Sequence, residues 1–353
     1  MTAAGDRHAW SRPEPEPVAP GVLRVPLPLP FDALRAVNVY VLSGPDGLTL
    51  VDGGWTLTTA REVLDAALAG SGAAVGDITR FLVTHMHRDH YTQAVALSRE
   101  TGAEVALGAG ERDSLELMAT RPTPMGAQLA GLRVAGAAAL ADEVAGTIPP
   151  PSDEEMADYA LPDRWLADGE RIAVADRTLT ALETPGHTRG HLVFEAEGTA
   201  GADAASERLL FAGDHVLPHI TPSIGFEPDA RPGALQRFLT SLARLRERPD
   251  RRLLPAHGPV APSVHARIDE LLDHHDARLT EIERRVVAGD ATAAEVAAAM
   301  TWTRRESKLD DLEGFHRVLA VLETDAHLEV LAAQGRVVRE QGDDGTARHT
   351  VGA

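Results

Sequence analysis

Three histidines and one aspartate stand together directly after a buried strand, and this cluster limits the possible folds more than any other feature. Residues 78–84 are mostly apolar or β-branched, which predicts a buried strand leading into His85, His87, Asp89 and His90. Ligands gather at the C-terminal ends of strands in α/β folds. Imidazole and carboxylate groups suit zinc, iron or manganese. A solvated polar turn is the alternative explanation.

Three later loops carry further candidate ligands in similar settings. His187 lies in the run TPGHTRGH, on a tight loop between two expected strands. Asp214 follows an expected strand and a close-packed Gly213, and His257 follows the strand that ends in the run LLPAHG. Two neighbouring cations need a carboxylate as a shared bridging ligand, and Asp214 could supply it. Each loop alone could be structural, but together they favour a metal site.

The composition excludes several other kinds of site. The chain of 353 residues has no cysteine, which excludes disulfides, iron–sulfur clusters, thiolate zinc sites and a cysteine nucleophile. Its net charge of −19 disfavours nucleic acid and anionic membranes as partners. No apolar run reaches membrane-spanning length, and the N-terminus lacks the apolar core of a signal peptide. We therefore expect a cytoplasmic protein without membrane association.

Hydrophobic periodicity predicts one α/β layered domain followed by a helical module. A disordered arm rich in Pro and Glu is expected over residues 1–20, the catalytic domain over 21–262, and a winged-helix-like module over 263–353. Expected strands are 22–29, 38–42, 48–51, 78–84, 104–107, 171–182, 191–195, 208–211 and 252–255, with a hairpin loop at 198–206. Expected helices are 58–68, 93–101, 233–246, 265–288, 293–300 and 312–334, and a mostly helical insertion spans about 111–164.

The motifs HMHRDH, PGH, GDH and PAHG, with Val51-Asp52-Gly53-Gly54, resemble the metallo-β-lactamase superfamily over about residues 22–262. The resemblance implies an αββα sandwich with the site at one edge between the sheets, holding two zinc ions, with iron or manganese as alternatives. Asp52 would orient the metal loop by hydrogen bonds. The implied first-ion ligands are His85, His87 and His187, the second-ion ligands are Asp89, His90 and His257, and Asp214 bridges the ions.

One position departs from the family pattern. The small glycine that usually follows the last histidine of the first motif is here Thr92, preceded by Tyr91. A β-branched residue takes a positive φ at high cost. We therefore expect a different helix start or a remodelled pocket wall, without loss of metal ligation. Of the other histidines, His191 would face the pocket or support its loop, whereas structural loop roles are favoured for His215 and His219.

The implied chemistry is attack of a metal-bound hydroxide on an acyl or phosphoryl centre, with Asp89 and Asp214 as catalytic residues. The acidic C-terminal part and the apolar insertion favour an acyl centre, in a thioester, ester or lactone. The substrate would be a small apolar acyl compound, and a homodimer remains open. Apolar residues of the insertion could form a lid over the site or could simply pack. These residues are Leu115, Leu117, Met118, Met125, Leu129 and Leu132.

Two other functions remain open. The C-terminal helices resemble those of the lactamase-β-like subgroup, which includes single-stranded RNA endonucleases beside hydrolases of the hydroxyacylglutathione type. However, residues 263–353 hold 11 Lys and Arg against 18 Asp and Glu, a net charge of −7, which disfavours RNA. A non-hydrolytic iron redox or metal-binding protein is the third hypothesis.

Overall fold

The chain folds around two β-sheets that face each other. The computed structural model describes residues 8–30, 34–121, 123–197, 208–229 and 231–352, so the hairpin loop expected at 198–206 lies outside the described residues. The first sheet has strands β1 to β7 in chain order, and the second has the order β12-β11-β10-β9-β8. Their bounds are β1 Glu16–Ala19, β2 Val22–Pro28, β3 Ala36–Gly44, β4 Gly47–Val51, β5 Ile78–Val83, β6 Glu104–Gly108, β7 Arg164–Leu166, β8 Arg171–Val174, β9 Arg177–Glu183, β10 Leu192–Ala196, β11 Leu209–Phe211 and β12 Arg252–Leu254.

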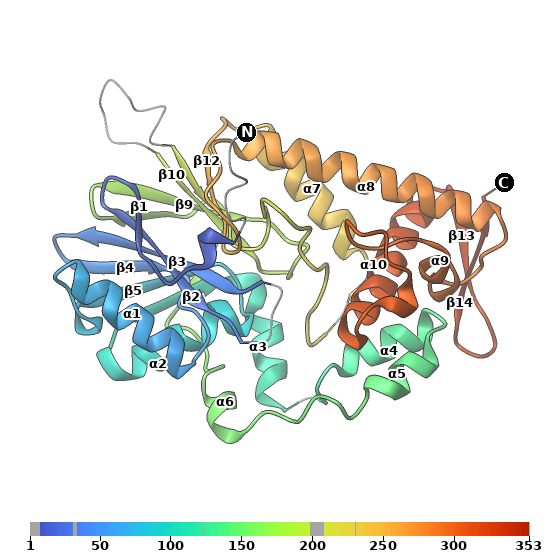
Figure 1. The fold of residues 1–353 in the computed structure, drawn as a ribbon, viewed down its shortest axis with the longest axis horizontal. Helices are drawn as coiled ribbons and strands as arrows, with labels where there is room; N and C mark the ends of the chain where they lie inside the picture. Colours follow the sequence, from blue (N-terminus) through green and yellow to red (C-terminus); the bar gives the residue numbers. More distant parts are fainter. Residues whose placement is uncertain (1–7, 31–33, 122, 198–207, 230, 353) are drawn as a thin grey trace.

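Alternation along the strands assigns each side chain to a layer. In β5, Phe81 points to the core shared with helices α1 (Thr58–Gly70) and α2 (Arg88–Thr101), whereas Leu82 points to the core between the sheets. In β10, Phe194 faces that same inner core, and Val193 faces the outer core that includes α7 (Ala234–Arg246). Period-two alternation thus builds the predicted αββα sandwich, seen in Figure 1.

Three elements differ from the sequence-based expectation. The end of the arm is ordered, because β1 pairs with β2, Val18 is buried, and Glu16 forms an ion pair with Arg24. The single strand predicted over 171–182 is an antiparallel hairpin, β8 and β9, which turns at Ala175 with a φ of 54°. Helix α2 begins at Arg88 and not at residue 93, so it includes two of the candidate ligands.

The insertion is mostly helical, as predicted. Its helices are α3 Arg112–Ala119, α4 Gly126–Val134, α5 Ala138–Val144 and α6 Asp153–Ala157. Leu115 is fully buried in the core under the first sheet, with Met118 packed against it, and Leu132 is fully buried in a core on the far side. Lid residues must reach a ligand, so Leu115 and Leu132 are packing residues.

The C-terminal part consists of three helices and a hairpin. These are α8 Val264–Val287, α9 Ala293–Ala299, α10 Gly314–Ala333, β13 Val337–Gln341 and β14 Ala347–Val351. Long helix α8 runs alongside α7, and α10 contacts α4 of the insertion (Figure 1). One continuous apolar core joins these helices to the outer face of the second sheet. Among the described residues, no helix is both long and apolar enough to cross a membrane.

Candidate metal centre

The first metal motif joins the end of β5 to the start of α2. His85 follows the strand, His87 is the N-cap residue of α2, and Asp89 and His90 lie in its first turn. A continued strand would send these side chains to alternate faces, whereas the helix start directs them towards one point. Gly53 permits α2 to approach, because a Cβ on it would lie 2.5 Å from the Ala94 backbone nitrogen.

The other candidate ligands follow strands of the second sheet. His187 comes after β9, Asp214 after β11 and His257 after β12, and β11 and β12 are parallel neighbours whose ends coincide. Gly213 has a φ of 48°, and a Cβ on it would lie 2.7 Å from His191 Nε2. The close-packed glycine expected before Asp214 is thereby confirmed.

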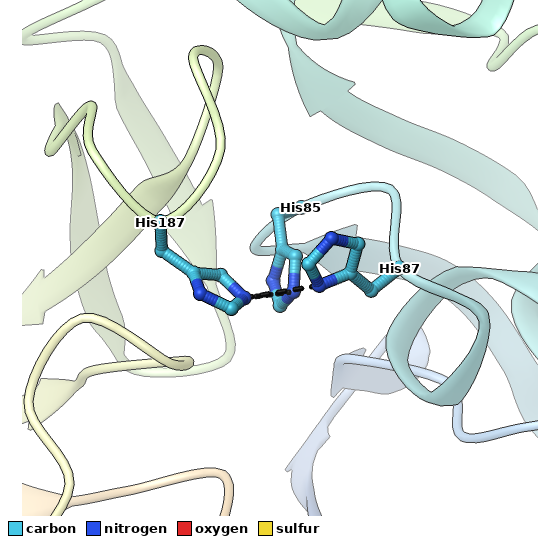
Figure 2. A group of neighbouring side chains, drawn as sticks. All are labelled: His85, His87 and His187. Atoms are coloured by element: carbon cyan, nitrogen blue, oxygen red, sulfur yellow. Dashed lines mark hydrogen bonds between the residues drawn. The ribbon is translucent and has the colours of Figure 1, made fainter. Parts of the chain in front are cut away.

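The first group of candidate ligands consists of His85, His87 and His187, whose ring nitrogens face one another (Figure 2). His187 Nε2 lies 3.2 Å from His85 Nε2 and 3.0 Å from His87 Nδ1. The opposite nitrogens are occupied: His187 Nδ1 donates to Ser223 O at 2.7 Å and His87 Nε2 to Phe226 O at 2.9 Å, because a carbonyl can only accept.

His85 has the same arrangement. The Thr84 hydroxyl donates to the Asp52 carboxylate at 3.0 Å, so it accepts from His85 Nδ1, also at 3.0 Å. All three facing nitrogens then carry lone pairs and cannot bond to one another. A tetrahedral zinc ion with bonds of about 2.0–2.1 Å would hold its nitrogen ligands about 3.3 Å apart, close to the observed spacing.

The second group consists of Asp89, His90 and His257. His90 Nδ1 donates to Asp52 Oδ2 at 2.9 Å, and His257 Nδ1 donates to Ala36 O at 2.8 Å. Their Nε2 atoms are buried without a hydrogen-bond partner among the described residues. Both face Asp89 Oδ2, at 3.7 Å from His90 and 3.4 Å from His257, too long for good hydrogen bonds but suited to a shared cation.

Asp214 stands between the two groups. Its Oδ2 lies 3.5 Å from His187 Nε2, and its Oδ1 lies 3.3 Å from His257 Nε2 and 3.6 Å from His90 Nε2. Oδ1 is buried and unpartnered among the described residues. Unpartnered buried donors and acceptors are costly unless an ion satisfies them. The residues present therefore fit two divalent cations with Asp214 between them.

The electrostatics of the two groups differ. Burial lowers the pKa of His187 to about 4 and also lowers the pKa of His85 and His87, so these imidazoles are neutral at pH 7 and have lone pairs available for a cation. Burial acts the same way on His90, but Asp52, Asp89 and Asp214 outweigh it and raise the pKa of His90 to about 10. The second group thus strongly favours positive charge.

The structure brings all seven predicted ligands together, and it shows which contacts three neighbouring residues make. His191 supports the loop: its Nε2 accepts the Asp214 amide at 3.1 Å, and its Nδ1 donates to Thr184 Oγ1 at 2.8 Å. Thr92 lies inside α2 and is not among the residues with positive φ, so its β-branched side chain is not held in a left-handed conformation. Tyr91 donates its hydroxyl to Ala160 O in the insertion at 2.6 Å.

Two other histidines have no ligand position. The His215 ring is buried against Phe238, with a centroid distance of 4.9 Å, and His219 is exposed on its loop. Sequence reasoning missed the carbonyls of Ala36, Ser223 and Phe226, because any residue type can supply a backbone oxygen.

Similarity to known proteins agrees with this geometry. "Probable metallo-hydrolase YqjP" of Bacillus subtilis is 26% identical over 330 residues, covering 89% of this chain and 92% of that protein. "Beta-lactamase-like protein 2 homolog" of Caenorhabditis elegans is 29% identical, but the match spans only 42% of this chain and 47% of that protein.

Among solved structures, the metallo-beta-lactamase family protein TTHA1429 from Thermus thermophilus matches with a TM-score of 0.74 and 29% identity. The match covers 95% of this chain and all of that one. A beta-lactamase domain protein from Burkholderia ambifaria gives a TM-score of 0.68 at 28% identity, over 96% and 95% of the two chains. The sequence model of the metallo-beta-lactamase superfamily matches residues 32–257, and the chain belongs to that superfamily.

Proposed function

We propose that the chain is a dinuclear metal-dependent hydrolase that cleaves an acyl bond in a thioester, ester or lactone. The observation that carries this proposal is the convergence of five imidazole lone pairs and two carboxylates in two sets, with the oxygens of Asp214 facing different sets. Two divalent ions, zinc in our proposal, would activate water and polarise the bond under attack. The superfamily of metallo-hydrolases is consistent with this chemistry.

The chain's own residues would orient the reactants and move the proton. The Asp89 side chain is 17% exposed against 10% for Asp214, so Asp89 is the carboxylate more open to water and substrate. We assign Asp89 to accept a proton from the attacking water and to pass it towards the leaving group. The backbone amide of Asp214 donates a hydrogen bond to His191 Nε2, and the carboxylate held in this way would fix the spacing between the two groups of candidate ligands.

An aromatic pair beside the first group supports an apolar substrate. The Phe226 carbonyl accepts a hydrogen bond from His87 Nε2, and the Phe226 ring lies 5.6 Å from the ring of Phe315 on α10. Phe315 is 48% exposed. An exposed large apolar side chain that packs on Phe226, the residue next to a candidate ligand, is suited to binding an acyl chain. The acidic surface of the C-terminal helices disfavours RNA in this place.

A parallel assay tests the proposal against its alternatives. Zinc-loaded protein is given acyl-thioesters, esters, lactones and single-stranded RNA, with Asp214→Ala as the inactive control. Hydrolysis of an acyl substrate with two ions per chain is expected. Cleavage of RNA alone would replace the proposal with the endonuclease alternative. Iron retained after aerobic purification, with no hydrolysis of any substrate, would favour the redox alternative.

A further inference from the structure

The segment of residues 217–229 contains no helix or strand, yet it orients two candidate ligands of the first group. Ser223 O accepts from His187 Nδ1 and Phe226 O accepts from His87 Nε2. The positions of these two carbonyls fix the ring orientation and tautomer of both histidines. A segment without regular structure needs outside contacts to hold those carbonyls in place.

Those contacts come from the C-terminal helices and the insertion. Arg267 on α8 donates through Nε to Leu217 O at 2.6 Å and through Nη2 to Ile220 O at 3.0 Å. Arg304, between α9 and α10, donates to His219 O at 3.1 Å. Gln128 on α4 is buried and donates to Glu227 O at 2.8 Å.

The buried side chain of Glu227 links this segment to the loop that carries His187. This side chain is 3% exposed and accepts the backbone amide of Arg189, two residues after His187. The Arg189 guanidinium also lies 3.4 Å from the Glu227 carboxylate. The same short segment therefore holds the His187 loop and receives support from α4.

The second group is anchored differently. His90 is held by Asp52 after β4, and His257 by Ala36 at the start of β3. The loop of His257 is fixed by the Tyr40 hydroxyl, which donates to Pro255 O at 2.8 Å, and by Asn38. All of these anchors belong to the first sheet or its edge.

We propose that the C-terminal helices and the insertion form a positioning platform that acts through residues 217–229 and orients the first metal group more strongly than the second. Arg267 and Gln128 are positioning residues in this arrangement. The proposal rests on the dinuclear function proposed above. It also gives the C-terminal module a role in assembling the site, in contrast to a role in binding nucleic acid.

Variants that each retain only one of the two metal groups allow the groups to be tested separately. His257→Ala leaves the first group intact, and His87→Ala leaves the second. Into each we introduce Gln128→Ala or Arg267→Ala, and measure Co²⁺ and Zn²⁺ dissociation constants by chelator competition. Arg246→Ala is the matched control, because it removes an ion pair to Asp269 on α8 without contacting the segment. Tyr40→Phe tests the opposite group.

Both positioning variants are expected to weaken ion binding about tenfold in the His257→Ala background and less than twofold in the His87→Ala background. Tyr40→Phe should show the reverse pattern, and Arg246→Ala should change neither. Equal weakening of both groups, or no weakening of the first, overturns the inference. If Gln128→Ala fails to fold, Glu227→Gln is measured in its place under the same criteria. Wild-type protein that binds fewer than two ions would instead refute the dinuclear function.

Discussion

The Asp52 carboxylate joins two parts of the metal motif. Its Oδ2 accepts a hydrogen bond from His90 Nδ1 at 2.9 Å, and its Oδ1 accepts one from the Thr84 backbone amide at 2.8 Å. Asp52 has a φ of 62°, a left-handed conformation that Asp and Asn tolerate better than most residues. The carboxylate therefore fixes the loop and also the His90 tautomer, which leaves the Nε2 lone pair facing the candidate ion.

We predict that Asp52→Asn weakens binding of the second ion by about 10- to 100-fold while the fold persists. An amide that offers its NH₂ group to His90 Nδ1 would reverse the tautomer and put a proton on Nε2. Chelator competition in the His87→Ala background measures the effect. Asp65→Asn on α1 is the control, being the same chemical change at an exposed ion pair. Unchanged affinity would show that Asp52 does not set the tautomer.

Asp214→Ala should reduce the metal content from two ions per chain to at most one. Among the described residues, Asp214 is the group whose two oxygens face both sets, so its removal takes a ligand from each. Elemental analysis of purified protein with a folded circular dichroism spectrum checks this. Two tightly held ions in the variant would contradict a bridging role.

The convergence of the seven candidate ligand side chains and the sandwich were predictable from sequence for a physical reason. Polar motifs at strand ends and period-two alternation are local patterns that the tertiary fold preserves. The ordering of β1 was not predictable, since its stability comes from pairing with β2 and burial of Val18. The anchoring by Ser223 and Phe226 carbonyls was equally hidden, because it depends on contacts that Arg267 and Gln128 make from distant parts of the chain.

Metal affinity should depend on pH in only one of the two groups. Neighbouring carboxylates outweigh burial and raise the pKa of His90 to about 10, so at pH 6–8 a cation must displace its proton. Affinity there should rise with pH, up to about tenfold per unit for one displaced proton. His187, whose pKa burial lowers to about 4, has no proton to displace in this range.

Calorimetry in buffers of different ionisation enthalpy counts the released protons at pH 6, 7 and 8. The His87→Ala background should release at least one proton per ion and the His257→Ala background close to none. Equal proton release in both would contradict the assigned electrostatics.

Phe315→Ala should raise KM for a long-chain acyl-thioester about tenfold and leave kcat unchanged, because the ring supplies apolar contact without touching the proposed ligands. KM for an acetyl-thioester should not change. Val287→Ala, an apolar residue 64% exposed at the end of α8, is the control. Equal KM increases for both substrates would mean that the Phe226–Phe315 pair does not bind the acyl chain.

A chain that ends at residue 262 should lose solubility or cooperative unfolding. Ile268 and Leu271 of α8 are fully buried in a core that also contains Phe238 of α7 and Val193 of the second sheet. Truncation would expose this apolar surface, which promotes aggregation. Sedimentation and thermal unfolding of the truncated and full chains measure the difference. A soluble truncated chain that melts cooperatively and binds two ions would show that residues 263–353 form an independent domain. In that event, salt-dependent RNA binding by the isolated C-terminal part would favour the endonuclease alternative, because phosphate contacts are lost as counterions compete.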